Sequence, residues 1–155
     1  MPVTIRSATL NDVSAILAIE RQAPSAAHWT SEQYNNLLGS GVVLVAEQAA
    51  EESSKESGKL SGFICAKAVA NEWEIENVVV AAAFLQRGVA NELLRDLIQH
   101  AQKRAASAIL LEVRESNRPA RRLYEKHGFR EVGRRPSYYR APAEDAILYA
   151  LRFDA

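Results

Sequence analysis

A single carboxylate interrupts one of the most apolar segments of the chain. Glu112 stands inside Ile109-Leu110-Leu111-Glu112-Val113, a run typical of a strand that is covered on both faces. A carboxylate there costs free energy unless it is paired or functional, and burial would raise its pKa toward the range of a general base. The alternative is an ion pair with Arg114 or with a neighbouring strand. Both interpretations stay open on this feature alone.

A second candidate feature is a glycine at a strand-to-helix junction. The β-branched run Val78-Val79-Val80 is followed, after a short connection, by Gln86-Arg87-Gly88-Val89-Ala90-Asn91, which opens a helical pattern. Successive backbone N–H groups and the partial positive charge of a helix N-terminus can hold a pyrophosphate, and Gln86 and Arg87 add donors. Glycine is also common at ordinary helix starts, so the turn by itself is a weak signal.

Two further polar residues lie near a later helix. Tyr124 falls on its apolar side, where core packing with a partner for the hydroxyl is the default interpretation. Asn117 precedes Pro119 and is by default the helix N-cap. Neither residue is diagnostic alone.

Taken together, these residues form a longer pattern. The segment Leu111-Glu112-Val113-Arg114-Glu115-Ser116-Asn117, followed by Ala120-Arg121-Arg122-Leu123-Tyr124-Glu125-Lys126-His127-Gly128-Phe129, resembles the L-E-V-R-x-S-N…A-x-x-L-Y-x-x-x-G-F signature of GNAT acetyltransferases, especially the bacterial ribosomal-protein alanine N-acetyltransferases. His28-Trp29-Thr30 and Arg134-Arg135-Pro136-Ser137-Tyr138-Tyr139 with Glu144-Asp145-Ala146 are similar to further motifs of that branch. The resemblance therefore covers nearly the whole chain.

The resemblance implies that acetyl-CoA is the cosubstrate. No metal is expected, because the histidines show no close ligand spacing. It assigns Glu112 as the general base and Tyr124 as the acid that protonates the departing thiolate. The residues that it places around the coenzyme are Val78, Val80, Gln86, Arg87, Gly88, Val89, Ala90, Asn91 and Asn117.

The same resemblance implies an amine acceptor. We expect the N-terminal α-amino group of a protein, such as a ribosomal protein, to be acetylated in a cleft shaped by Trp29, Tyr138 and Tyr139. A small-molecule amine is the alternative acceptor, and a catalytically silent CoA-binding module is the alternative of another class. The residues do not specify the acceptor or the oligomeric state.

One position departs from the family pattern. The pyrophosphate motif is Q/R-x-x-G-x-G/A, and Leu85 occupies its first position, whereas Gly88 and Ala90 keep the rest. Because backbone N–H groups make most of the contacts with the pyrophosphate, we expect coenzyme binding to persist with a weaker or shifted contact.

The periodicity of apolar residues predicts the elements that must position these groups. Strands are expected at 3–7, 42–48, 60–70, 73–80, 108–113, 129–133 and 146–153, and helices from Thr9-x-x-Asp12, over 30–39, from Gly88 over about four turns, and over 119–127. The polar stretch 49–59 is expected to be a hairpin loop. The order predicts an α/β (α+β) GNAT fold with a mixed sheet of about six to seven strands and helices on both faces.

Composition sets the broad class. The chain has 155 residues, of which 48% are hydrophobic and 25% charged, which favours one globular domain over 1–155. With 19 basic and 19 acidic residues, no net field draws it to nucleic acid or to an anionic membrane. The lone Cys65 is expected to be buried and inert, and His28, His100 and His127 lack metal-ligand spacing. The absence of an apolar signal segment predicts a cytoplasmic protein.

Overall fold

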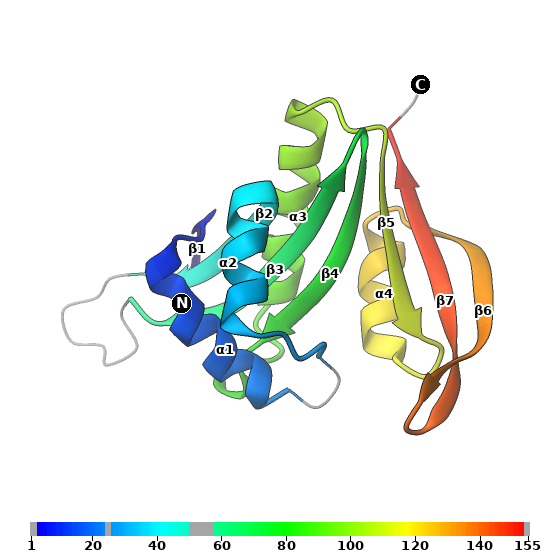
Figure 1. The fold of residues 1–155 in the computed structure, drawn as a ribbon, viewed down its shortest axis with the longest axis horizontal. Coiled ribbons are helices and arrows are strands. Elements are labelled where there is room, and N and C mark those ends of the chain that lie inside the picture. Colours follow the sequence, from blue (N-terminus) through cyan, green and yellow to red (C-terminus); the bar gives the residue numbers. More distant parts are fainter. Residues whose placement is uncertain (1–2, 24–25, 50–57, 154–155) are drawn as a thin grey trace.

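The computed structural model describes residues 3–23, 26–49 and 58–153. Within them the chain forms a seven-stranded sheet with four α-helices and two short 3-10 turns (Figure 1). The elements are β1 (Val3–Ser7), η1 (Leu10–Asp12), α1 (Val13–Arg21), α2 (Ser31–Ser40), β2 (Gly41–Gln48), β3 (Leu60–Val69), β4 (Glu72–Val80), η2 (Ala82–Phe84), α3 (Val89–Lys103), β5 (Ala108–Arg114), α4 (Arg118–Lys126), β6 (Arg130–Arg140) and β7 (Ala143–Arg152).

The sheet is mixed, as predicted. Its order is β1-β2-β3-β4-β5-β7-β6. Neighbouring strands pair antiparallel except β4 and β5, which are parallel and are joined through α3. Figure 1 shows the two halves of the sheet diverging between β4 and β5.

Each face of the sheet carries its own hydrophobic core. Residues of α1 and α2, among them Ile16 and Tyr34, pack with Phe63 on one face. On the other face Leu93 and Leu97 of α3 pack with residues of the central strands, and Tyr124 of α4 joins the same core. Helices therefore cover both faces, as the periodicity predicted (Figure 1).

The start of α2 follows the predicted capping box, but its end does not fall at Gly39. Thr30 Oγ1 accepts from Gln33 N at 3.2 Å, and the Trp29 and Tyr34 rings pack 5.4 Å apart. The helix continues to Ser40, and β2 begins at Gly41. The predicted stop at Gly39 was wrong because the close approach occurs two residues later: a Cβ on Gly41 would lie 2.4 Å from the Ala66 carbonyl oxygen.

Both ends of α4 follow the prediction closely. Asn117 Oδ1 accepts from Ala120 N at 3.3 Å, which confirms Asn117 as the N-cap. Gly128 has a φ of +94°, the left-handed conformation usual after a helix end. Phe129 then packs against Tyr124 with 5.6 Å between the ring centroids.

The last two strands are longer than predicted. β6 continues through the arginine-rich stretch to Arg140, where apolar alternation gives no strand signal. Ion pairs support this exposed edge instead: Arg134 contacts Glu115 at 2.7 Å and Asp145 at 2.9 Å.

Two smaller expectations concern Cys65 and the connector. Cys65 is fully buried, and burial raises the pKa of its thiol, so the inert interpretation is supported. β2 and β3 pair antiparallel, as expected for a hairpin, but most of the predicted loop at 49–59 lies outside the described residues.

In the described part of the chain, none of the helices has the length and apolar character needed to cross a membrane.

Candidate active site

The site begins where the central pair of parallel strands separates. β4 and β5 are in register only at Glu72–Ala108, Trp73–Ile109 and Glu74–Leu110. Beyond Glu74, the main-chain groups of β4 that face β5 have no strand partner among the described residues. The sheet is therefore open at the ends of these two strands, and unpaired backbone donors and acceptors line the opening.

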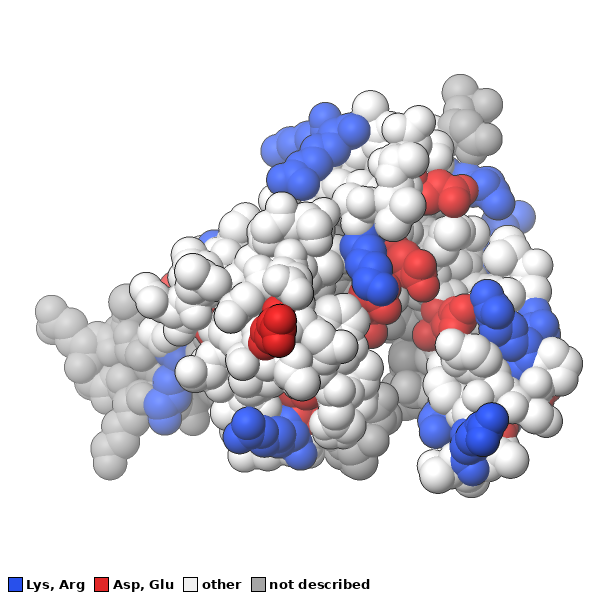
Figure 2. Space-filling view, in the orientation of Figure 1, with Lys and Arg blue, Asp and Glu red and all other residues white. Residues whose placement is uncertain are grey.

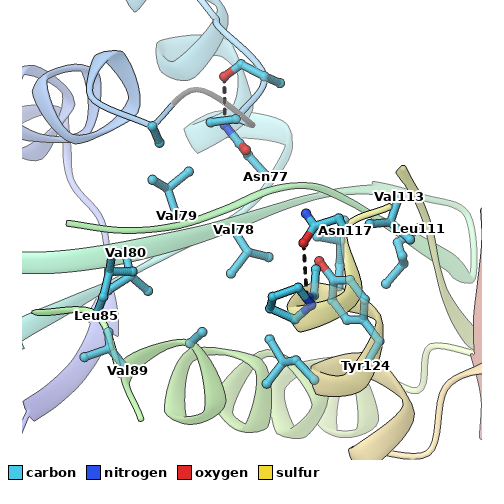
Figure 3. A pocket seen from close by; sticks show the side chains of 18 of the residues that line it. Asn77, Val78, Val79, Val80, Leu85, Val89, Leu111, Val113, Asn117 and Tyr124 are labelled. Atoms are coloured by element: carbon cyan, nitrogen blue, oxygen red, sulfur yellow. Dashed lines mark hydrogen bonds between the residues drawn. The ribbon is translucent and has the colours of Figure 1, made fainter. Parts of the chain in front are cut away.

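A β-bulge in β4 changes which side chains face the opening. Cys65 pairs with Asn77, whereas the next residue of β3, Ala66, pairs with Ile75, so Glu76 is the extra residue. Before the bulge Ile75 packs on the α3 side, and after it Val79 packs on the α1 and α2 side. The bulge thus turns Val78 and Val80 toward α3, where Figure 3 shows them above that helix.

A cavity of about 810 Å³ occupies this opening. It extends from the α1–α2 side, where Ala26 and Ala27 line it, to the start of α3 and the inner side of α4. Glu112 and Tyr124 both line it although their side chains come from opposite faces of the sheet, since Leu111 and Val113 share the core of Tyr124. The separation of the strands is what lets one cavity reach both groups.

The N-terminus of α3 forms one end of the cavity. Gly88 is the N-cap with a φ of +81°, and a Cβ there would meet nothing within 4 Å, so the backbone conformation alone favours glycine. The first turn of this 15-residue helix, with Gly88, Val89, Ala90 and Asn91, lines the cavity. Its unpaired N–H groups and helix dipole can bind an anion.

Comparison with known proteins decides the family. The sequence profile of the acetyltransferase (GNAT) family matches residues 11–129. The [ribosomal protein bS18]-alanine N-acetyltransferase of Escherichia coli (strain K12) is 32% identical over 150 residues, which is 96% of each chain. The chain is a GNAT acetyltransferase.

Solved structures agree with this assignment. The crystal structure of the ribosomal-protein-S18-alanine N-acetyltransferase from Escherichia coli superposes with a TM-score of 0.87 at 30% identity, covering 99% of this chain and 96% of that one. Arabidopsis thaliana NAA60 in complex with acetyl-CoA shares the fold with a TM-score of 0.88 at 21% identity, covering 99% and 100%. The enzyme is therefore an N-acetyltransferase of this fold.

In this GNAT acetyltransferase, Glu112 is both paired and accessible to the cavity. Its side chain is 22% exposed, and Oε1 lies 2.9 Å from Arg135 Nε. The expectation of a strand covered on both faces was wrong for β5, because Glu112 and Arg114 face the opening while Leu111 and Val113 are buried. Glu112 does form an ion pair, but its partner lies on β6, which is separated from β5 by β7, and is neither Arg114 nor a residue of an adjacent strand.

Tyr124 is buried in the wall of the cavity. Its ring packs with Phe129 and Tyr149, and burial raises the pKa of its phenol well above the usual value. No hydrogen bond occupies its hydroxyl among the described residues, in contrast to the sequence-based expectation of a partner (Figure 3). The phenol is therefore held protonated beside the cavity.

The residues predicted to hold the coenzyme divide into two groups. Val78, Val80, Gln86, Gly88, Val89, Ala90, Asn91 and Asn117 line the cavity. Arg87 is absent from its lining, and its guanidinium lies 5.4 Å from the centre of the Phe84 ring. The Asn91 side chain contacts His127 Nε2 at 2.6 Å, and so links α3 to the end of α4. Leu85 also lines the cavity and is 58% exposed.

The three residues predicted to shape the acceptor cleft do not all reach it. Tyr139 lines the cavity, with the Arg114 guanidinium 4.3 Å from its ring centre. Tyr138 is 50% exposed and lies outside the lining. Trp29 also lies outside it and packs on Tyr34.

Among the polar residues of the cavity that sequence reasoning missed are Glu76 and Asn77. Glu76 Oε1 is 3.4 Å from Lys67 Nζ without hydrogen-bond geometry, and burial, with the charges of Glu74 and Glu112 adding to it, raises its pKa despite that lysine. In the sequence, Glu72, Glu74 and Glu76 alternate with other residues, which indicates only a solvated strand face. No local sequence feature predicts the bulge. On the face of the molecule drawn in Figure 2, acidic side chains gather in the middle, with basic side chains beside them.

Within the described residues, no group of three or more His, Cys, Asp or Glu side chains could hold a metal ion.

Proposed function

We propose that this enzyme acetylates the N-terminal α-amino group of a protein, such as a ribosomal protein, with acetyl-CoA as donor. The observation that carries the proposal is one cavity lined by Glu112, Tyr124 and the first turn of α3. The relative from Escherichia coli, named for alanine acetylation of ribosomal protein bS18, supports the choice of acceptor.

The residues of the cavity suit acetyl-CoA. The N-terminus of α3 offers backbone N–H groups to the pyrophosphate, and the unpaired edge of β4 at Val78 and Val80 offers main-chain groups to the pantetheine arm. Asn117 lies on the same wall and is available for a further contact.

The reaction follows from two proton-transfer groups on one cavity. An α-ammonium group has a pKa near 8 and must lose its proton before attack. Glu112 accepts that proton, directly or through water. The amine nitrogen then bonds to the thioester carbon, the C–S bond breaks, and Tyr124 gives its proton to the departing thiolate. The nitrogen releases its second proton to water, and Tyr124 regains a proton from solvent. Main-chain N–H groups near Val80 stabilise the intervening oxyanion.

The charge around the opening supports an amine acceptor. Glu76 and Glu112 stand on β4 and β5, on the two sides of the separation, and both line the cavity. Arg135 and Lys67 neutralise part of their charge, but the carboxylate oxygens can still accept hydrogen bonds from an ammonium group at the place where it must be deprotonated.

The test is acetyl-CoA turnover against short peptides that differ in their first two residues, with free polyamines and aminoglycosides as controls. We expect turnover of peptides with small first residues. Strong turnover of the free amines and none of the peptides would assign the enzyme to small-molecule acetylation instead.

The companion variant is Glu112→Gln, which keeps the size of the side chain and removes the base. We expect kcat to fall about 10²-fold or more while the affinity for acetyl-CoA is nearly kept. An unchanged pH profile of turnover would refute the base role. Binding of acetyl-CoA without acetylation of any amine would favour a silent binding module.

A further inference from the structure

Three buried polar side chains form a connected chain beside the cavity. Glu20 of α1 is 1% exposed and Tyr34 of α2 is also 1% exposed, and the Tyr34 hydroxyl donates to Glu20 Oε2. Asn77 of β4 is 7% exposed, and its Nδ2 lies 3.4 Å from the Tyr34 hydroxyl. These hydrogen-bonded side chains thus connect α1 and α2 to β4, the strand that borders the opening.

The same side chains also hold the backbone between α1 and α2. Asn77 Nδ2 donates to the Ala27 carbonyl oxygen at 3.0 Å, and the Trp29 backbone N–H donates to Glu20 Oε1 at 3.0 Å. Figure 3 shows Asn77 reaching from β4 toward this segment, with its hydrogen bond marked. Contacts from both sides therefore fix residues 26–29 relative to β4.

The fixed segment is part of the cavity wall. Ala26, Ala27 and Asn77 line the cavity together with Ile19 of α1. Asn77 lies across β4 from the start of α3, where the coenzyme pyrophosphate is proposed to bind (Figure 3). Under the proposed function, this wall is the side from which an acceptor meets the thioester.

Stability alone does not explain the arrangement. Burying a carboxylate and an amide costs more than burying apolar groups of similar volume unless every partner is in place. Burial and the hydrogen bond to Glu20 raise the pKa of Tyr34, so its hydroxyl stays a donor. What polar groups add, and apolar groups cannot, is a fixed position for the Ala27 carbonyl and the Trp29 N–H.

We propose that Glu20, Tyr34 and Asn77 are positioning residues that set the acceptor wall of the cavity, and so determine how the acceptor's first residue fits. This inference rests on the proposed acetylation of a peptide-like acceptor in the same cavity. The residues act through residues 26–29 and take no part in proton transfer.

The test uses two variants and one matched control. Asn77→Leu keeps the volume and removes the bond to Ala27, and Tyr34→Phe keeps the ring and removes the hydroxyl. Ser61→Ala is the control, because Ser61 is fully buried and its Oγ donates to the Ala46 carbonyl at 3.3 Å, away from the cavity lining. All three remove one buried hydrogen-bonding group.

We expect the KM for the acceptor to rise about three- to tenfold in Asn77→Leu and Tyr34→Phe, because each variant removes two of the hydrogen bonds that connect residues 26–29 to β4 and the helices. The KM for acetyl-CoA should stay at the wild-type value, and Ser61→Ala should change neither. Equal rises in both KM values, or an unchanged acceptor KM in a folded Asn77→Leu enzyme, would overturn the proposal.

A second measurement does not depend on activity. Hydrogen exchange of the Trp29 amide should be about tenfold faster in Asn77→Leu and Tyr34→Phe than in the wild type and Ser61→Ala, since its bond to Glu20 loses support. Unchanged exchange would contradict the positioning role. If the wild-type enzyme acetylates only small amines, the proposed peptide acceptor fails, and the same KM comparison with that amine still tests the wall.

Discussion

Replacing Tyr124 by Phe separates chemistry from stability in this enzyme. The ring packs with Phe129 and Tyr149, and Phe keeps those contacts. Because no hydrogen bond holds the Tyr124 hydroxyl among the described residues, its loss should change the free energy of unfolding by less than about 1 kcal/mol. If the phenol protonates the thiolate, however, kcat should fall about 10²-fold, equivalent to about 2.7 kcal/mol of barrier.

Tyr149 offers the matched control. It is as buried as Tyr124, and its hydroxyl accepts from Arg121 Nε at 3.0 Å and donates to Glu125 Oε2 at 2.7 Å, but it does not line the cavity. Tyr149→Phe should therefore lower the free energy of unfolding by about 1 to 2 kcal/mol, since it removes one hydrogen bond to each of two charged groups, and should leave kcat unchanged. Arg121 keeps its bond to the Glu115 carbonyl oxygen at 2.9 Å. Tyr124→Phe is thus expected to lower kcat without changing stability, and Tyr149→Phe to lower stability without changing kcat.

The assay is release of the free CoA thiol with a saturating peptide acceptor, alongside urea denaturation of each variant. The acid must be protonated, and burial places its pKa above the ordinary value of about 10, so this group should cause no fall in kcat between about pH 7 and 9. The reasoning is refuted if Tyr124→Phe retains wild-type kcat, or if it loses activity only in proportion to lost stability.

Three further changes test other parts of the structure. Leu85→Gln adds an amide beside the first turn of α3 and removes an exposed apolar group, so the KM for acetyl-CoA should fall about threefold with kcat unchanged; an unchanged or higher KM would contradict this. Gly41→Ala would place a Cβ 2.4 Å from the Ala66 carbonyl oxygen and should lower the free energy of unfolding by about 2 kcal/mol in urea titrations, whereas an unchanged midpoint would argue for a relaxed backbone. The Arg6 guanidinium lowers the pKa of Asp12, so that carboxylate stabilises the fold above its usual pKa near 3.8 and ceases to do so as pH falls through the lowered value. Asp12→Asn should accordingly be less stable than wild type by about 1 kcal/mol at neutral pH, with the difference vanishing in acid; a difference independent of pH would exclude the ion pair as its cause.

Local signals in the sequence were sufficient for most elements and for several of their ends. The Thr30 and Asn117 caps, the turn at Gly128 and the apolar spacing of α3 each involve residues close together in the chain. Errors arose where a distant strand intervened. The end of α2 depends on how closely Gly41 approaches β3, and β6 depends on ion pairs along its edge.

The candidate site shows the same division. The motif around Glu112 and Tyr124 was visible in the sequence and indicated the family. The catalytic roles of Glu112 as base and Tyr124 as acid stay predictions. Sequence could not tell that Arg135 pairs with Glu112, because that contact joins side chains of β6 and β5, which are distant in the chain. The contact of Arg87 with Phe84 is local, but it depends on the backbone path of the connection before α3, which residue types alone do not specify.

The order of residues alone determined which segments become strands and helices, and which side chains are chemically capable of proton transfer, because these depend on neighbours within a few positions. Only the tertiary structure decided that β4 and β5 separate after Glu74, that Glu76 forms a bulge, and that Asn77 fixes the wall opposite α3. Strand pairing and bulges reflect packing between distant segments, and their energies are shared among many contacts that no single stretch of sequence contains.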